Sequence, residues 1–500
     1  TFTYALLIAR FEGAEPLTFA SAEGALSRGH GLLSEVLGLL DSPRARREVE
    51  TSTDMLVRVI GQIIPSAITA RDGDNPWLYF YEEFLAAYDP ALRKKVGAYY
   101  TPVEVVHAQV SFVRDLLRTR FGKEDAFADD GVVTLDPAVG TGTYPLGILR
   151  SVIDSVSSHL AGSRPDLLRR AVENLYGIEY LIGPYSVAHL RLSRFLADNG
   201  VTTDEERPLN ILLADTLASH ETNGEAMLSG VFGYEQIERE REIARELKVD
   251  TRVVVCMGNP PYLRGRKAEG GASIGGWVTL RRAPGPGQKV RDPITRRMVK
   301  DTGEIGIIRD FTAPVIAEGR GGDLKNLYNA YVYFWRWALW KVFEQEIPAP
   351  SEAFPVQSGI ISFITASSYL RGPAFTGMRR HMREVLDEIW IVDLGGDNKG
   401  GRRTENVFAI ETPVAILTGV RYGTPNPSTP AKVHYVSLAD MTATEKRSRL
   451  DSMSGLDDPS LDWLDGMEAW EAPLLPAADE TYLSWPAVTD LFPWQVSGPQ

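Results

Sequence analysis

The chain has very little cysteine and no excess of basic residues. Its 500 residues include one cysteine, Cys256, which excludes an intrachain disulfide and a cysteine-rich zinc site. This scarcity fits a reducing compartment, so we expect a cytoplasmic protein. The formal net charge is −13 at pH 7, which excludes a globally basic nucleic-acid-binding protein but not a local basic groove.

Long apolar runs are also missing. No stretch of about 18 apolar residues occurs, so no membrane-spanning helix is expected. The most apolar segment, residues 327–343, contains Arg336 and Lys341 and is predicted to be an aromatic core helix. The first residues lack a basic start and a small-residue cleavage site, so we expect no signal peptide. The first residue is not methionine and the last residues stop abruptly, which suggests a fragment, although methionine removal explains the first observation equally well.

What is present is the composition of a globular protein, with 44% hydrophobic and 24% charged residues. The length predicts two or three domains. Residues 1–95 place apolar side chains at helical spacing, which predicts a helical unit. From residue 131 to about 420, short β-branched runs alternate with helical stretches, which predicts a doubly wound, Rossmann-like α/β domain with a parallel sheet covered on both faces. The expected strands are 132–136, 175–179, 209–213, 253–257, 359–365, 390–394 and 413–418.

One long segment, 263–322, interrupts this pattern. It holds 12 glycines in 60 residues, and its 12 basic and 6 acidic residues give a net charge of +6. A structureless loop of this length is rare in a compact domain unless it is functional or disordered. Two interpretations stay open: a mobile surface insertion, or a loop that contacts nucleic-acid phosphates.

A glycine-containing loop follows the first expected strand. Its glycines permit a sharp turn and a close approach of a ligand to the backbone. The loop is neither a dinucleotide fingerprint, because the third glycine is missing, nor a P-loop. Its leading carboxylate disfavours a pyrophosphate and suits a cationic ligand group, although an ordinary strand-to-helix turn is the simpler alternative. The loop residues are Asp136, Pro137, Ala138, Val139, Gly140, Thr141 and Gly142.

Two further carboxylates follow the next two expected strands. Glu179 ends the second strand, where an acidic side chain can bind both ribose hydroxyls. Asp215 follows the third strand, where it can accept a hydrogen bond from an adenine amino group. Each carboxylate alone is explained equally well as a helix cap or turn residue. Together with Asp136 they match a ligand with a positive centre, a ribose and an adenine, which is S-adenosylmethionine.

The fourth expected strand leads into Asn259, Pro260, Pro261 and Tyr262. The two prolines predict a rigid, extended corner at the edge of the sheet. The Asn259 side-chain oxygen and the Pro260 carbonyl can accept the N–H bonds of a conjugated amine, which frees its lone pair for attack on a sulfonium methyl group. The Tyr262 ring can stack on a base, a contact worth about 1–3 kcal/mol. A plain turn is the alternative.

Cysteine and histidine chemistry are not expected. A cytosine-C5 mechanism needs an exposed, activated thiol, but Cys256 lies inside an apolar strand and is predicted to be buried. The histidines have no metal-ligand spacing, so we expect no metal site. They are residues 30, 107, 159, 189, 220, 381 and 434.

These motifs resemble the amino-group DNA methyltransferases, and specifically the N6-adenine enzymes whose cofactor motif precedes the catalytic one. The resemblance implies S-adenosyl-L-methionine as cofactor and double-stranded DNA as substrate, with the target adenine flipped out of the duplex. It assigns Asn259, Pro260, Pro261 and Tyr262 to catalysis. It also assigns Phe408, in the segment 406–408, to packing against the flipped base, with simple core packing as the alternative. The cofactor residues that it implies are Tyr100, Thr101, Pro102, Asp136, Pro137, Ala138, Gly140, Gly142, Glu179, Asp215 and Asn259.

The segment 79–102 is similar to the join between coupler and methyltransferase in the long type ISP and type IIG restriction-modification enzymes. This similarity implies a bacterial protein with a helical coupler at 1–95 and a methyltransferase domain at 96–425. The residues 426–500 would lead to a target-recognition region. Nuclease and translocase parts would lie elsewhere on a longer chain or on partner subunits, because no Walker motif and no convincing nuclease cluster occur here.

We therefore expect a site-specific DNA adenine-N6 methyltransferase of a restriction-modification or phage-defence system. Two alternatives stay open. The same tetrad serves a protein glutamine-N5 methyltransferase, since an amide nitrogen has the same delocalised lone pair. A non-catalytic module that binds cofactor or DNA is the other. The sequence determines neither the DNA recognition site nor the oligomeric state.

Overall fold

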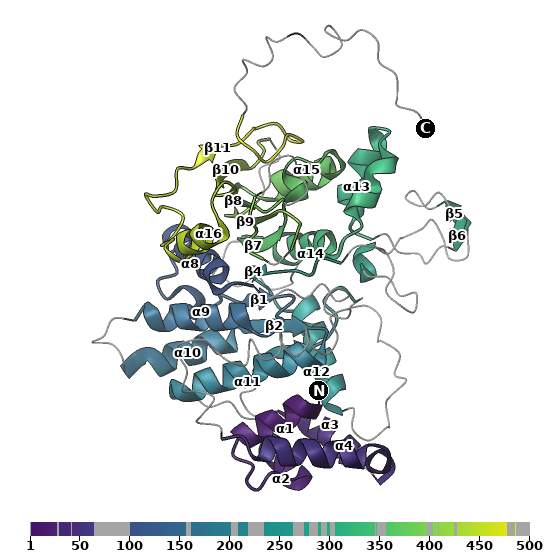
Figure 1. Ribbon diagram of the computed structural model, residues 1–500. Coiled ribbons are helices and arrows are strands. Elements are labelled where there is room, and N and C mark those ends of the chain that lie inside the picture. The colour runs from purple at the N-terminus through teal and green to yellow at the C-terminus, as the bar shows by residue number, and fades with distance from the viewer. Residues whose placement is uncertain are drawn as a thin grey trace.

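A computed structural model shows a nine-stranded sheet enclosed by helices, with a small helical unit at one end (Figure 1). None of the helices that the structure describes has the length and apolar character needed to cross a bilayer. The described residues are 2–27, 30–41, 43–64, 101–156, 162–201, 209–218, 235–263, 275–279, 289–291, 298–300, 306–345, 347, 357–397, 404–408, 410–424, 428–477 and 486.

The strand order is β11-β10-β8-β9-β7-β4-β1-β2-β3. Strand β1 pairs in parallel with both β2 and β4, so the chain reverses its direction of winding at β1 and β4. Ligands of doubly wound sheets bind beside such a switch point, at the carboxyl ends of the strands. The strands are β1 (Thr134–Asp136), β2 (Leu175–Glu179), β3 (Ile211–Leu213), β4 (Val255–Gly258), β7 (Gly359–Ala366), β8 (Glu388–Gly395), β9 (Val414–Arg421), β10 (Lys432–Ser437) and β11 (Leu464–Asp465).

All seven expected strands are present, but the sheet is mixed. Strand β9 runs antiparallel to both of its neighbours, β7 and β8, so the prediction of a wholly parallel sheet was wrong. Every residue of β9 is buried. A strand buried on both faces therefore shows the same continuous apolar pattern whichever way it runs. The sequence prediction also missed β10 and β11 at the edge of the sheet.

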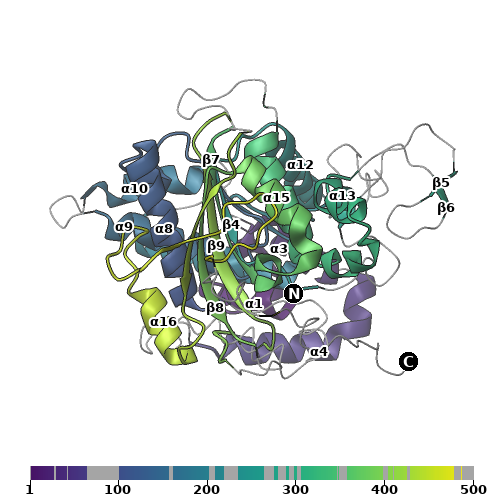
Figure 2. The same cartoon turned by 90° about the horizontal axis from the view of Figure 1, so that it is seen from above.

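Helices cover the sheet on both faces, as predicted (Figure 2). One layer packs against the apolar cluster that includes Phe112, Leu149 and Leu450, and the other against the cluster that includes Phe311 and Trp335. The first layer consists of α8 (Val103–Phe121), α9 (Thr143–Asp154), α10 (Arg164–Glu173), α11 (Ile182–Asp198) and α16 (Ala443–Asp451). The second consists of α12 (Glu235–Val249), α13 (Arg309–Ala317), α14 (Ala330–Leu339) and α15 (Thr376–Val385).

The predicted aromatic core helix is confirmed. It is α14, which continues into a single turn of π-helix, η5 (Trp340–Glu344). All ten residues of α14 are buried, because aromatic and aliphatic side chains surround the whole helix. Arg336 and Lys341 are buried too, and both are hydrogen-bonded.

The N-terminal residues that the structure describes are helical, as predicted. The helices α1 (Phe2–Phe11), α2 (Phe19–Leu26), α3 (Gly31–Asp41) and α4 (Pro43–Gly61) share one apolar cluster. This cluster also includes Leu190 of α11, so the helical unit packs on the outer side of the sheet layer. Residues 65–100 lie outside the described residues.

The segment 263–322 contains more regular structure than its composition indicates. A two-stranded hairpin of β5 (Lys289–Arg291) and β6 (Met298–Lys300) stands away from the main sheet in both views (Figures 1 and 2). Helix α13, however, packs against α15 through Phe311 and Val315, which are fully buried. The end of the segment therefore belongs to the core, which corrects the expectation of a structureless loop. That expectation came from glycine and charge counts, which take no account of these apolar residues.

Candidate active site

The glycine loop joins β1 to α9 at the switch point. Gly140 and Gly142 have φ values of +55° and +81°, in the left-handed region that favours glycine. A Cβ on Gly142 would lie 3.2 Å from the Cα of Ala188 in α11. The buried Arg191 of α11 donates to the carbonyl oxygen of Thr141 at 2.6 Å. The loop is thus fixed by an arginine that the sequence gave no reason to select.

Asp136 is fully buried at the carboxyl end of β1. Its Oδ1 accepts a hydrogen bond from Ala138 N at 3.0 Å, whereas its Oδ2 is buried and has no hydrogen-bond partner among the described residues. Burial, with a smaller contribution from Glu179, raises the pKa of the Asp136 carboxyl to about 8, although the Ala138 hydrogen bond opposes the shift. An unpaired buried carboxylate oxygen is costly, and a cationic ligand group would satisfy it.

Gly258, the last residue of β4, lies very close to Asp136. A Cβ on Gly258 would lie 2.6 Å from Asp136 Oδ1. We expect Gly258→Ala to displace this carboxylate and to weaken cofactor binding about tenfold or more, the equivalent of losing one charge-assisted hydrogen bond. Isothermal titration calorimetry with S-adenosylmethionine, the cofactor expected from the sequence, measures the change. Gly24→Ala is the matched control, because no atom lies within 4 Å of its Cβ position. Equal affinity in the Gly258 and Gly24 variants would contradict the expectation.

Glu179 links the second strand to the glycine loop. Its Oε2 accepts from Gly140 N at 2.9 Å and its Oε1 from Leu181 N at 2.8 Å. Burial raises the pKa of Glu179 to about 7, against the effect of these backbone hydrogen bonds. A carboxylate has about four acceptor positions, so ribose hydroxyls can still bind. Tyr180, the next residue in the sequence, has a large aromatic side chain that is 73% exposed, and the sequence analysis overlooked it.

Asp215 is an exposed residue at a turn after β3, and its Oδ1 accepts from Leu217 N at 2.9 Å. Two side chains that the motif search did not select hold this turn. Lys248 of α12 donates to the carbonyl oxygen of Asp215 at 2.6 Å. Thr216 donates to the carbonyl oxygen of Pro137 at 2.5 Å, which ties the turn to the glycine loop. The three predicted carboxylates therefore meet at one edge of the sheet.

The tetrad follows β4, the strand beside β1, so Asn259 and Asp136 come from adjacent strand ends. Asn259 Nδ2 donates to Thr101 Oγ1 at 3.1 Å. The Tyr262 hydroxyl lies 3.0 Å from Asn259 Oδ1 and 3.2 Å from the carbonyl oxygen of Ile364. Burial raises the pKa of Tyr262 well above its usual value, so the hydroxyl keeps its proton. The structure thus brings Thr101 and the tetrad together.

Three other predicted residues have different outcomes. Cys256 is fully buried in β4, and burial raises the pKa of its thiol well above the usual value, which confirms the structural interpretation. Phe408 is 6% exposed and packs in the apolar cluster with Trp390 and Val414. Its contact with a flipped base stays a prediction. Tyr100 lies outside the described residues.

Asp310, Glu344 and His381 have ligand atoms within 4.8 Å of one another. The buried guanidinium of Arg336 already lies among them, 2.5 Å from Asp310 Oδ2 and 2.7 Å from Glu344 Oε2. Burial opposes ionisation of Glu344, but hydrogen bonds from His381 and the charge of Arg336 lower its pKa to about 2. We interpret this cluster as an ion-pair network around an arginine.

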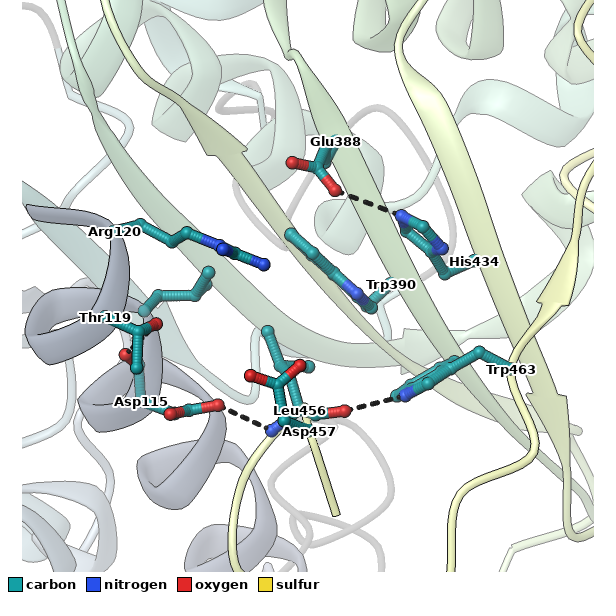
Figure 3. Close-up of a pocket in the computed structure, with 10 residues that line it drawn as sticks. Asp115, Thr119, Arg120, Glu388, Trp390, His434, Leu456, Asp457 and Trp463 are labelled. Carbon is teal, nitrogen blue, oxygen red and sulfur yellow. Dashed lines mark hydrogen bonds and ion pairs between the residues drawn. The ribbon is translucent and has the colours of Figure 1, made fainter. Parts of the chain in front are cut away.

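A separate pocket of about 140 Å³ lies between α8 and the strands β8 and β10 (Figure 3). Trp390 stacks on His434 with ring centroids 5.2 Å apart, and His434 contacts Glu388 at 3.1 Å. Glu388 begins β8, whereas Asp136 ends β1, and the two strands point the same way. The pocket is therefore at the opposite edge of the sheet, and none of the predicted site residues lines it.

A match to a protein-family model agrees with the geometry of this site. Residues 79–268 match the N-6 DNA methylase family model. The match includes the glycine loop, the three carboxylates and the tetrad. The predicted resemblance to N6-adenine DNA methyltransferases is thereby confirmed. No curated protein matches this chain.

Solved structures extend the likeness from residues 79–268 to most of the chain. The cryo-EM structure of a DrdV–DNA complex is 25% identical with a TM-score of 0.62, over 90% of this chain and 38% of that one. The ATP-dependent type ISP restriction-modification enzyme LlaBIII bound to DNA shares the fold at 18% identity, with a TM-score of 0.64. A nuclease-deletion mutant of the type ISP enzyme LlaGI with a DNA substrate mimic shares it at 20% identity, with a TM-score of 0.63.

The chain is much shorter than these relatives. The alignment with LlaBIII includes 94% of this chain but 28% of LlaBIII. The alignment with LlaGI includes 97% of this chain but 39% of LlaGI. This chain thus corresponds to one part of each longer enzyme.

Proposed function

We propose that the chain is an S-adenosylmethionine-dependent methyltransferase that modifies N6 of adenine in double-stranded DNA. The observation that carries the proposal is the position of Asn259, at the end of β4, beside the buried Asp136 at the end of β1. An acceptor for an amine and an unpaired carboxylate for a cation thus lie at one switch point. The family match of residues 79–268 supports the same chemistry.

The residues fit the cofactor. The unpartnered Asp136 Oδ2 suits a cationic group, Glu179 suits ribose hydroxyls and Asp215 suits an adenine amino group. Thr101, which the family resemblance assigns to the cofactor, contacts Asn259, and Pro102 follows it at the start of α8. The exposed ring of Tyr180 offers a further surface for the adenine. When bound, the cofactor supplies the electrophilic methyl group.

The chain's own residues act on the target base. Asn259 Oδ1 and the Pro260 carbonyl would accept the two N–H bonds of the exocyclic amine, which frees its lone pair. Tyr262 would stack on the flipped base and offset part of the few kcal/mol needed to extract it. The ring of Phe408 would support the base from a neighbouring segment. Asn259 would also border the cofactor, which would bring the amine and the methyl group together.

We further propose that this region works within a longer restriction-modification or phage-defence enzyme of the bacterial cytoplasm. The short coverage of LlaBIII and LlaGI supports this. In this scheme residues 1–95 are a helical coupler, 96–425 the methyltransferase and 426–500 the lead into target recognition. Nuclease or translocase parts would be supplied by the rest of the chain or by partners.

The part of the basic segment 263–322 that precedes α13 would contact DNA phosphates. Its hairpin sequence carries Lys289, Arg291 and Lys300, in line with this role. We expect limited proteolysis to cut the segment quickly in free protein and several-fold more slowly when duplex DNA is bound. Raising the salt concentration should abolish the protection, because phosphate contacts are screened. Equal cleavage rates with and without DNA would identify a plain surface insertion.

The function is tested by transferring label from radioactive S-adenosylmethionine into a mixture of unmethylated DNA and cell protein. Nuclease and protease then separate the products. Label recovered as N6-methyladenine supports the proposal, and label retained on protein supports the glutamine alternative. A protein that binds cofactor but transfers no label needs a longer chain that includes the recognition region.

A further inference from the structure

The carboxamide of Asn259 is held from both ends. Its Nδ2 donates to Thr101 Oγ1 at 3.1 Å, and its Oδ1 lies 3.0 Å from the Tyr262 hydroxyl. An amide has an acceptor at one end and a donor at the other. A 180° flip would therefore turn Nδ2 toward the target amine, where a second donor cannot help. The partner of Nδ2 thus matters for catalysis.

Tyr262 is a dispensable partner for the amide oxygen. Its hydroxyl lies 3.2 Å from the carbonyl oxygen of Ile364, so it keeps an acceptor when an incoming amine takes its place at Asn259 Oδ1. The bond between Asn259 Nδ2 and Thr101 does not compete with the amine. It therefore persists through the reaction and restrains the amide.

We propose that Thr101 is a positioning residue that keeps the Asn259 amide oxygen directed at the target amine. The proposal rests on the methyltransferase function above and deepens it, because the family resemblance places Thr101 only in the cofactor motif. Thr101 is 7% exposed and 158 residues away from Asn259 in the sequence. Only the fold brings its hydroxyl to the tetrad.

The position of Thr101 is rigid for two reasons. It precedes Pro102, whose ring restricts the preceding backbone to extended conformations. It also leads directly into α8, which is anchored in the core by the fully buried Gln109. Gln109 Nε2 donates to Ser362 Oγ of β7 at 3.0 Å, and its Oε1 accepts from the Tyr144 hydroxyl of α9 at 2.6 Å. The helix therefore cannot slide relative to the strand beside β4.

The test compares Thr101→Val, which removes the hydroxyl, with Thr101→Ser, which keeps it. Single-turnover methyl transfer is measured on duplex DNA at saturating cofactor, and cofactor affinity is measured separately by calorimetry. We expect the valine variant to react about tenfold to a hundredfold more slowly, with an affinity within about threefold of the parent, because one buried donor loses its partner. The serine variant should recover most of the rate.

Thr119→Val is the matched control, since it removes an exposed hydroxyl at the other end of α8. Its rate should equal that of the parent protein. A Thr101→Val variant with the parent's rate at saturation overturns the proposal, and so does one whose only defect is weaker cofactor binding. Failure of the parent protein to methylate any DNA, in a chain long enough to include the recognition region, would instead count against the proposed function.

Discussion

Replacing Asn259 with alanine should abolish methyl transfer and leave cofactor affinity nearly unchanged. The substitution removes the Oδ1 acceptor that we assign to the target amine, so the lone pair stays delocalised into the base. Losing such a preorganised group costs about a hundredfold to a thousandfold in rate, and loss of the amine's orientation adds to this. Single-turnover transfer to duplex DNA and calorimetric titration of S-adenosylmethionine measure the two effects independently.

Asn199→Ala is the control for this experiment. Asn199 caps the end of α11 and makes a local hydrogen bond, from Nδ2 to the carbonyl oxygen of Phe195. It should retain the parent rate. Thermal unfolding of the Asn259 variant checks that the loss of its bonds to Thr101 and Tyr262 leaves the fold intact. Parent-like methylation by a folded Asn259→Ala protein would refute the mechanism.

Cofactor affinity should rise several-fold per pH unit between pH 6 and about pH 8 and then level off. Burial raises the pKa of Asp136 to about 8, so the carboxyl holds its proton below that pH. A cationic cofactor group binds the ionised form more strongly, so binding must release this proton. Calorimetry in buffers of different ionisation enthalpy measures the released protons directly.

Asp136→Asn should lose most of this pH dependence and bind weakly throughout. The remainder would come from Glu179, whose pKa burial raises to about 7. The effect of pH on folding stability has the opposite sign to its effect on cofactor affinity. The folded protein keeps the Asp136 proton that the unfolded chain releases near pH 3.8, so this group contributes less stability as pH rises from about 4 to about 8. A pH-independent affinity in the parent protein would show that Asp136 does not face the cofactor's charge.

Most of the fold could be predicted because the buried strands are short apolar runs separated by amphipathic helices. Strands β1, β2, β3, β4, β7, β8 and β9 were all anticipated from this pattern. The direction of β9 could not be predicted, since its eight buried residues fit a parallel or an antiparallel neighbour equally well. Strand β10 was missed because only alternate residues are buried at this edge of the sheet, and its apolar run is correspondingly weak.

The residues of the candidate site could likewise be predicted only in part. Asp136, Glu179 and Asn259 could be selected because each follows an expected strand, and carboxyl ends of parallel strands lie at one edge. Arg191 and Lys248 could not be selected, because a basic residue on a helix usually lies on the solvated face. Their burial is a tertiary property: each reaches a backbone carbonyl of a loop from another element.

The sequence by itself predicted the chemistry that we propose for this protein, because the candidate groups occupy short segments whose order and spacing carry the information. The glycine loop, the carboxylates and the tetrad can be identified without coordinates. Only the tertiary structure decided how these groups are positioned and how their pKa values are shifted. The contact of Thr101 with Asn259 and the raised pKa of Asp136 both arise from burial among residues far apart in the sequence, and no local pattern encodes such proximity.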